Sequence, residues 1–199
     1  MLERLPLYLQ YLKSESDSPT VSATAVARAL NLGEVQVRKD LGIVSGAGKP
    51  KVGYVTSELI RHLEEYLGYR TENNAVIVGA GKLGRALLDY DGFSEYGLRI
   101  LAAFDNDDRL TGMTDNGKQI LPISEFSDYC KEQKPKIGII TVPEKYAEEV
   151  CDLMIHYGIL AIWNFSRKQL KVSEDILVRN ENMASSLAVL SVYLNHKSS

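Results

Sequence analysis

Apolar residues in the first seventy positions recur at helical spacing. Leu2, Leu5, Leu9 and Leu12 predict a first amphipathic helix. Ser22 is a plausible N-cap for a second helix, and Asn31-Leu32-Gly33 makes a short turn before a third. The inward positions of these two helices are Ala23, Val26, Ala27, Leu30, Val37, Leu41 and Val44. Two short helices joined by a three-residue turn containing glycine are typical of a helix-turn-helix.

A glycine-rich segment with two lysines, residues 46–55, follows the third helix. A fourth helix starting near Thr56 then buries Leu59, Ile60, Leu63 and Leu67. Three helices, a basic hairpin and a further helix are the order of a winged helix, whose third helix enters the major groove. Gln36 would pair with adenine, and Arg38 or Lys39 with guanine or phosphate. The alternative is a small helical cap whose charges face water.

The pattern changes after the polar segment at residues 69–74. From there strands alternate with helices, which predicts a parallel, doubly wound sheet. We expect strands at 75–78, 100–105, 137–142 and 159–163, and an irregular excursion at 111–122 before a helix starting near Ser124. A helix from Pro143 would bury Ala147, Val150, Cys151 and Met154.

The first of these strands leads into Gly79-Ala80-Gly81-Lys82-Leu83-Gly84. Strand, G-x-G-x-x-G turn and helix together indicate dinucleotide binding. The first glycine permits the tight turn, the second lets the backbone approach a pyrophosphate, and Gly84 allows close packing of helix and strand. Asp105 closes the next strand, where a carboxylate would hold the ribose, and its charge favours NAD over NADP.

Other candidates follow the remaining strands, because ligands in this fold lie across the carboxyl ends. Thr141 and Asn164 would bond to ribose or a carboxamide, and Phe165 would pack on an aromatic ring. Val142 and Pro143 lie at the same predicted edge. Each of these residues is equally well explained as a turn residue without a ligand.

The segment from Met183 to Leu194 contains no charged residue, and its apolar side chains face nearly every direction of a helix. Such a helix must be buried. It packs either on its own sheet or on a partner subunit, with residues 170–178 as a strand-like connection. A two-fold dimer suits a helix-turn-helix protein, which reads paired half-sites.

Composition narrows the class of protein. The net charge of −3 gives no general affinity for polyanions, although residues 28–51 hold five basic and two acidic side chains. The two cysteines lack metal-ligand spacing and point to a reducing compartment. No apolar run is long enough for a membrane span, and the N-terminus does not read as a signal peptide. We therefore expect a cytoplasmic protein without metal or membrane partner.

A dinucleotide fold usually belongs to a dehydrogenase, but no catalytic set is visible. None of the three histidines, His62, His156 and His196, lies at a predicted strand end. Cys151 is expected in the core. Tyr193 and Lys197 have the Tyr-x-x-x-Lys spacing of short-chain dehydrogenases, which chance explains better so near the terminus. The rival interpretations are an NAD-dependent oxidoreductase with an N-terminal helical cap, and a module for another nucleotide such as coenzyme A.

Taken in order, the motifs resemble those of the redox-sensing transcriptional repressor Rex family over nearly the whole chain. They are Arg4-Leu5-Pro6-Leu7-Tyr8, Gln36-Val37-Arg38-Lys39-Asp40-Leu41, Val52-Gly53-Tyr54, the glycine motif, Phe104-Asp105, Thr141-Val142-Pro143, and residues 158–165.

The resemblance implies an α/β chain with a winged-helix DNA-binding domain (1–70), a Rossmann-like parallel-sheet domain for NADH and NAD+ (71–181) and a helix exchanged between the subunits of a homodimer (182–199). It implies release from palindromic, double-stranded operator DNA when NADH accumulates. The predicted DNA contacts are Gln36, Arg38, Lys39, Lys49, Lys51 and Tyr54.

Three residues depart from the family pattern. Lys51 stands where the wing usually has glycine, and Lys82 replaces a more usual asparagine in the glycine loop. Near phosphate either cation is favourable. Asn182 replaces an aspartate that pairs with the equivalent of Arg4 in the family, so the ion pair of that interdomain switch is lost and only a hydrogen bond to Arg4 can take its place.

Overall fold

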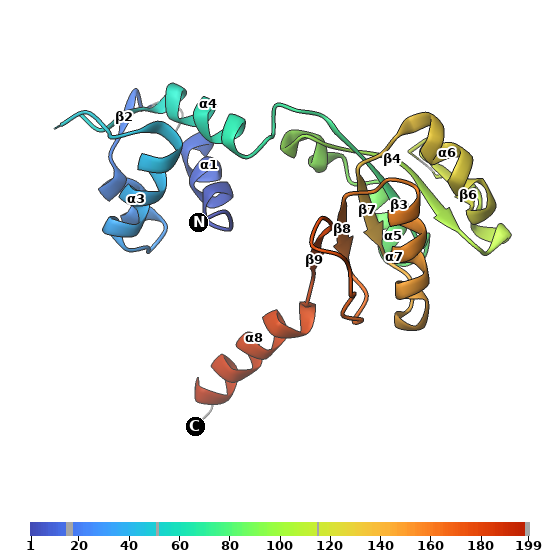
Figure 1. The fold of residues 1–199 in the computed structure, drawn as a ribbon. Coiled ribbons are helices and arrows are strands. Elements are labelled where there is room, and N and C mark those ends of the chain that lie inside the picture. The colour runs from blue at the N-terminus through green and yellow to red at the C-terminus, as the bar shows by residue number, and fades with distance from the viewer. Residues whose placement is uncertain (15–17, 51, 115, 198–199) are drawn as a thin grey trace. The chain divides into compact units, whose positions relative to one another are not determined.

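The structure is a computed structural model that describes residues 1–14, 18–50, 52–114 and 116–197. It divides into two compact units (Figure 1). The first, here called the head, comprises Met1–Thr71 with Glu95–Gly97. The second, the body, comprises Glu72–Ser94 with Leu98–Ser199. Each unit is described by itself.

The head contains four helices, α1 (Leu5–Ser14), α2 (Ala23–Ala29), α3 (Glu34–Ser45) and α4 (Thr56–Tyr66). Strand β1 (Thr20–Val21) pairs antiparallel with β2 (Tyr54–Val55). The predicted helical stripes form its core, except that Leu2 is 63% exposed. The N-cap at Ser22 is confirmed, since its Oγ accepts a hydrogen bond from the Ala25 backbone N at 3.0 Å.

A short hairpin, the wing, connects α3 to β2. Lys49 and Gly53 exchange two backbone hydrogen bonds of 2.8 and 2.9 Å, and this pair closes the turn. Gly53 has φ +85°, and a Cβ there would collide with the Val21 carbonyl. Glycine is therefore required where the wing returns to β1. The predicted order of a winged helix is confirmed.

The body contains one seven-stranded sheet in the order β5-β6-β4-β3-β7-β8-β9. Every neighbouring pair is parallel except the β5–β6 hairpin. The strands are β3 (Asn73–Val78), β4 (Leu98–Asp105), β5 (Gly112–Met113), β6 (Gln119–Pro122), β7 (Ile137–Ile140), β8 (Ala161–Asn164) and β9 (Leu177–Asn180). The predicted doubly wound sheet is confirmed.

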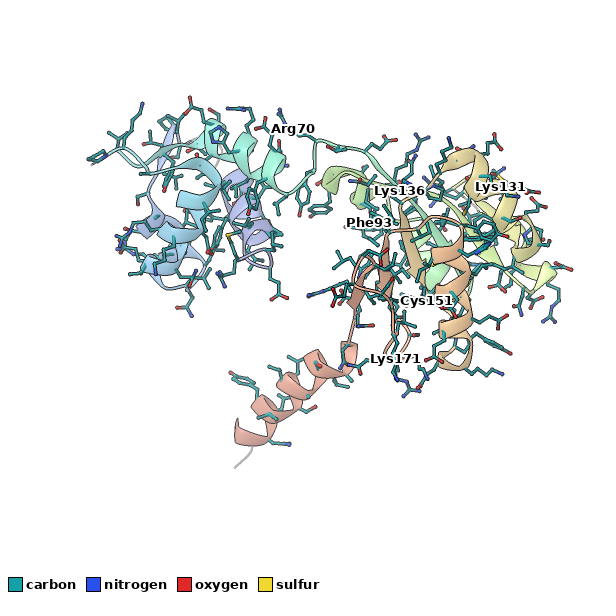
Figure 2. The ribbon with its side chains drawn as sticks, viewed as in Figure 1. Arg70, Phe93, Lys131, Lys136, Cys151 and Lys171 are labelled. Atoms are coloured by element: carbon teal, nitrogen blue, oxygen red, sulfur yellow. The ribbon has the colours of Figure 1, made fainter. Side chains whose placement is uncertain are left out.

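Helices cover both faces of this sheet. On one face α6 (Phe126–Gln133) and α7 (Ala147–His156) bury Phe126, Cys130, Cys151 and Met154 against the strands (Figure 2 labels Cys151). On the other face α5 (Lys82–Leu88) packs Leu88 against Ile77 and Ile139. Short 3-10 turns link these elements at Asp91–Tyr96, Asp108–Leu110, Ile123–Glu125 and Glu144–Tyr146.

Three expectations for the body were wrong in detail. Residues 111–122 are not an irregular excursion, because β6 extends the sheet beside β4. Only the end of the predicted 170–178 connection is a strand, and β9 pairs in parallel with β8. The helix expected from Pro143 begins as α7 at Ala147, after a 3-10 turn. Short strands of this kind are set by their sheet neighbours rather than by their own sequence.

The last helix is α8 (Met183–Lys197), which follows β9 at the C-terminal end of the body (Figure 1). Its apolar residues Leu187, Val189, Leu190, Val192, Tyr193 and Leu194 are 55–70% exposed. Exposed apolar surfaces of this kind are typical of contacts with another molecule. Among the helices that the structure describes, none is long and apolar enough to cross a membrane.

Candidate functional site

The glycine loop, Asp105, Thr141 and Asn164 lie at one edge of the body's sheet. They end or follow β3, β4, β7 and β8, which are adjacent parallel strands. Neighbouring parallel strands place their carboxyl ends at the same edge, where ligands of this fold bind. The structure thus brings these predicted residues together, and their contact with a nucleotide stays a prediction.

The glycines of the loop meet different surroundings. Gly79 has φ +106°, and a Cβ there would lie 2.8 Å from the Thr141 carbonyl carbon. A Cβ on Gly84, at the buried side of α5, would collide with the Gly79 carbonyl oxygen. A Cβ on Gly81 would meet nothing within 4 Å. Two glycines are required by the fold, whereas Gly81 leaves open backbone at the start of α5.

Asp105 connects β4 to the glycine loop. Its Oδ2 accepts a hydrogen bond of 2.6 Å from the Ala80 backbone N, and its Oδ1 accepts one of 2.9 Å from Asp107 N. Asp107 is paired with Arg109 at 2.7 Å, and hydrogen bonds from that guanidinium and backbone lower the Asp107 pKa to about 2. The turn after β4 therefore holds the Asp105 carboxylate against the loop.

Two polar candidates bond within the protein. The Thr141 hydroxyl donates to the Gly79 carbonyl at 2.6 Å. Asn164 is fully buried, and its Nδ2 donates to Lys168 O and Asn180 Oδ1, both at 2.8 Å, while Ser166 donates to its Oδ1. These bonds shape the edge around Asn164, and its direct bond to ribose or a carboxamide stays a prediction.

The remaining candidates differ in exposure. Lys82, Leu83 and Pro143 are exposed, Ala80 is buried, and Val142 is half-buried. Phe165 lies beside Trp163 with ring centroids 4.9 Å apart, and Trp163 contacts Phe93, labelled in Figure 2, at 5.6 Å. Sequence reasoning missed this aromatic cluster, because the 3-10 turn that carries Phe93 has no periodic pattern.

The histidines and cysteines show no catalytic arrangement among the described residues. His62 Nδ1 lies 2.7 Å from Ser45 Oγ in the head, and His156 stacks edge-on against Tyr157. Burial raises the pKa of both Cys130 and Cys151 to about 11, so neither thiol is activated. Within the described ranges no group of acidic, histidine and cysteine side chains could hold a metal ion.

The head presents its predicted DNA contacts along α3 and the wing. Gln36, Arg38 and Lys39 are exposed on α3, and Lys49 is exposed on the wing. Lys51 lies outside the described residues. Tyr54 is only 8% exposed and packs in the head core beside Gly48, and its direct contact with DNA stays a prediction. The apolar residues on either side of Tyr54 follow no regular pattern, so the sequence did not indicate that its side chain is buried.

The two predicted switch residues each have a partner in their own unit. Arg4 binds Asp40 through two hydrogen bonds, of 2.9 Å from Nε and 3.2 Å from Nη2. Asn182 Oδ1 accepts hydrogen bonds from Ala184 N and Ser185 N and so caps α8. A contact between Arg4 and Asn182 stays a prediction.

Known proteins match the whole chain. Residues 1–42 match the family described as "Putative DNA-binding protein N-terminus", and residues 70–168 the family described as "CoA binding domain". A redox-sensing transcriptional repressor Rex from Treponema denticola is 42% identical over 98% of this chain and 94% of its own. The Rex of Bacteroides fragilis is 39% identical over 98% and 89%. The chain belongs to the redox-sensing transcriptional repressor Rex family.

Solved structures of one Rex-family repressor, RSP, share the fold at 31% identity. The complex of RSP with β-NAD+ and operator DNA has a TM-score of 0.91 and covers 98% of this chain and 91% of RSP. The complex with β-NADH has a TM-score of 0.89, with coverages of 98% and 93%. Membership in a family of transcriptional repressors decides against the oxidoreductase alternative.

Proposed function

We propose that this protein is a transcriptional repressor that binds palindromic operator DNA as a homodimer and releases it when NADH accumulates. The observation that carries the proposal is the joining, in one chain, of a winged-helix head to a sheet edge built for a dinucleotide. No catalytic set accompanies that edge in the described part of the chain. The nucleotide is then a signal and not a reagent.

Two features of the edge fit NAD(H). Gly81 leaves its backbone open for a pyrophosphate, and exposed Lys82 adds a favourable cation beside it. Asp105 has accepted two backbone hydrogen bonds, and a carboxylate offers about four acceptor positions, so it retains capacity for ribose hydroxyls. Its charge disfavours a 2′-phosphate, which favours NADH over NADPH.

The nicotinamide ring, whose charge depends on the redox state, would bind near Pro143 and Phe165. Half-buried apolar and aromatic side chains surround Phe165 there. Oxidised nicotinamide carries a positive charge, which costs more to transfer into such surroundings than the neutral reduced ring. A ligand shifts a two-state protein only through its difference in affinity between the states, and this charge supplies such a difference.

The second subunit would cover two apolar surfaces. One is α8, whose apolar residues are exposed. The other is a groove of about 350 Å³ whose lining comes from β4, β7, β8 and β9 and includes Leu98, Ile137, Ala161, Trp163 and Leu177. Exchange of α8 between two copies of the chain would bury both surfaces and pair two heads for a palindromic site. We place this repressor in the cytoplasm, with the DNA it regulates.

The deciding experiment is a gel shift with the full-length protein on duplex DNA selected by that protein from a random pool. Increasing NADH should dissolve the complex, while equal concentrations of NAD+ should leave most of it intact. The proposal fails when saturating NADH leaves the complex unchanged and NAD+ or NADPH dissolves it. Sedimentation of the free protein should give a dimer.

A further inference from the structure

The head contains one buried carboxylate, Asp40, among the described residues of its core. Asp40 lies on α3 and is 2% exposed. Its Oδ2 accepts hydrogen bonds of 2.9 Å from Arg4 Nε and from Tyr8 Oη, both on or next to α1. Its Oδ1 accepts from Arg4 Nη2 at 3.2 Å and from Gln36 Nε2 at 2.9 Å. All four acceptor positions of the carboxylate are thus used.

The carboxylate stays ionised in this setting. Burial alone would raise the pKa of Asp40, but the hydrogen bonds from Arg4, Tyr8 and Gln36 more than offset it, and the pKa lies below its ordinary value. An ionised carboxylate accepts hydrogen bonds and donates none. The nitrogen end of the Gln36 amide must therefore face Asp40, because its oxygen would be repelled.

This arrangement decides what Gln36 presents to DNA. One N–H of its amide is bonded to Asp40, which leaves the second N–H and Oε1 for a ligand. Adenine offers N7 as an acceptor and N6 as a donor in the major groove, and a glutamine amide matches both. We infer that Asp40 is a positioning residue that sets the amide of Gln36 for adenine, rather than a residue that only stabilises the head.

The inference rests on the proposed function, since it assigns a role within DNA recognition. Asp40→Asn keeps the size of the side chain but supplies an N–H toward Gln36. The Gln36 amide can then turn its oxygen to position 40 and present nitrogen to the base. The N6 amino group of adenine would then lose the Gln36 oxygen that accepts its hydrogen bond, so discrimination between bases should fall. Phosphate contacts and NADH binding should not change.

The test uses full-length protein and the duplex that the wild type selects from random DNA. Base pairs of one half-site are replaced one at a time. For each replacement we measure the ratio of the protein's affinity for the selected duplex to its affinity for the altered duplex. Gln36→Ala should reduce discrimination at an adenine by on the order of tenfold. Asp40→Asn should reduce it at the same base pair, and the double variant should lose no more than Gln36→Ala alone.

Glu64→Gln is the matched control, because it also converts a head carboxylate to an amide and weakens ion pairs with Lys13 and Arg70. It should retain full discrimination. The inference is overturned when Asp40→Asn keeps the wild-type ratio, when Glu64→Gln loses it equally, or when the losses in the double variant add. A wild type that selects no palindrome overturns the proposed function itself.

If Asp40→Asn does not fold, hydrogen exchange of side-chain amide protons in the wild type tests the same inference. The side-chain amide protons of Gln36, assigned by their absence in Gln36→Ala, should exchange with solvent more slowly than those of Gln10. Gln10 is an exposed glutamine of the same unit, on α1. Equal exchange rates for the two amides would show that Asp40 does not hold Gln36.

Discussion

Asp40 and Asp105 each lie beside a surface that is predicted to bind a partner, but the hydrogen-bond acceptors of the two carboxylates are satisfied in different ways. Asp40 is surrounded by side chains from α1 and α3, and all its acceptor positions are used. Asp105 accepts from two backbone N–H groups and is only half-buried. A saturated carboxylate fixes its neighbours, whereas a partly satisfied one can still take a ligand. Asp40 is thus held by side chains and Asp105 by backbone groups.

The largest test of this contrast compares two glycines of the body's loop. Gly84→Ala should lower the free energy of unfolding by about 2–4 kcal/mol, because its Cβ collides with the Gly79 carbonyl. Gly81→Ala should leave stability nearly unchanged but weaken NADH binding, since its methyl group occupies the open backbone side. Thermal unfolding and NADH fluorescence titration separate the two effects. Equal destabilisation by both variants would contradict a loop built on selective close contacts.

The next test removes the negative charge of the Asp105 carboxylate at the body's sheet edge. Asp105→Asn should weaken NADH binding by about 1.5–3 kcal/mol, because it loses charge-assisted hydrogen bonds and cannot accept fully from Ala80. Operator binding without nucleotide should persist. Asp108→Asn, an exposed neighbour, serves as the control and should bind NADH normally. Titration calorimetry measures both, and wild-type affinity for Asp105→Asn would exclude the ribose assignment.

A smaller effect is expected from the exposed cations of the head. Arg38→Ala and Lys39→Ala should each reduce DNA affinity by about 1 kcal/mol and lower the salt dependence by about one unit per lost phosphate contact. NADH affinity should stay the same. Lys131→Ala on α6 of the body is the matched control. Fluorescence anisotropy at several salt concentrations measures the affinity. An unchanged slope of log affinity against log salt concentration would show that Arg38 and Lys39 do not contact phosphate.

The smallest expected effect is the pH dependence from Asp40. Its pKa is lower in the folded head than its ordinary value of about 3.9, so its contribution to stability is complete above about pH 4. It is lost as the pH falls through the pKa of Asp40 in the folded head. Urea unfolding between pH 3 and 6 should show a flatter curve for Asp40→Asn. The same slope in both proteins would mean that Asp40 is not specially stabilised.

Prediction from sequence succeeded where a signal is local. The glycine motif, the stripes of α2 to α4 and the parallel strands all depend on residues a few positions apart, and the structure has them. It failed for β6, which exists only because β4 lies beside it. It also gave no sign that the buried amide of Asn164 is bonded to Asn180 of the next strand. Nor did it indicate that the side chain of Tyr54 lies in the head core.

The sequence by itself predicted a helical unit followed by a parallel-sheet unit, the dinucleotide motif and the helix that we expect to read DNA, because periodicity and turn chemistry act over short distances. Only the tertiary structure decided which polar groups remain available for partners. Arg4 and Asp40 are 36 positions apart, and Ala80 and Asp105 are 25 apart. Such pairs form when packing closes long loops, which no local pattern records. Tertiary packing thus saturates Asp40 and leaves acceptor capacity on Asp105.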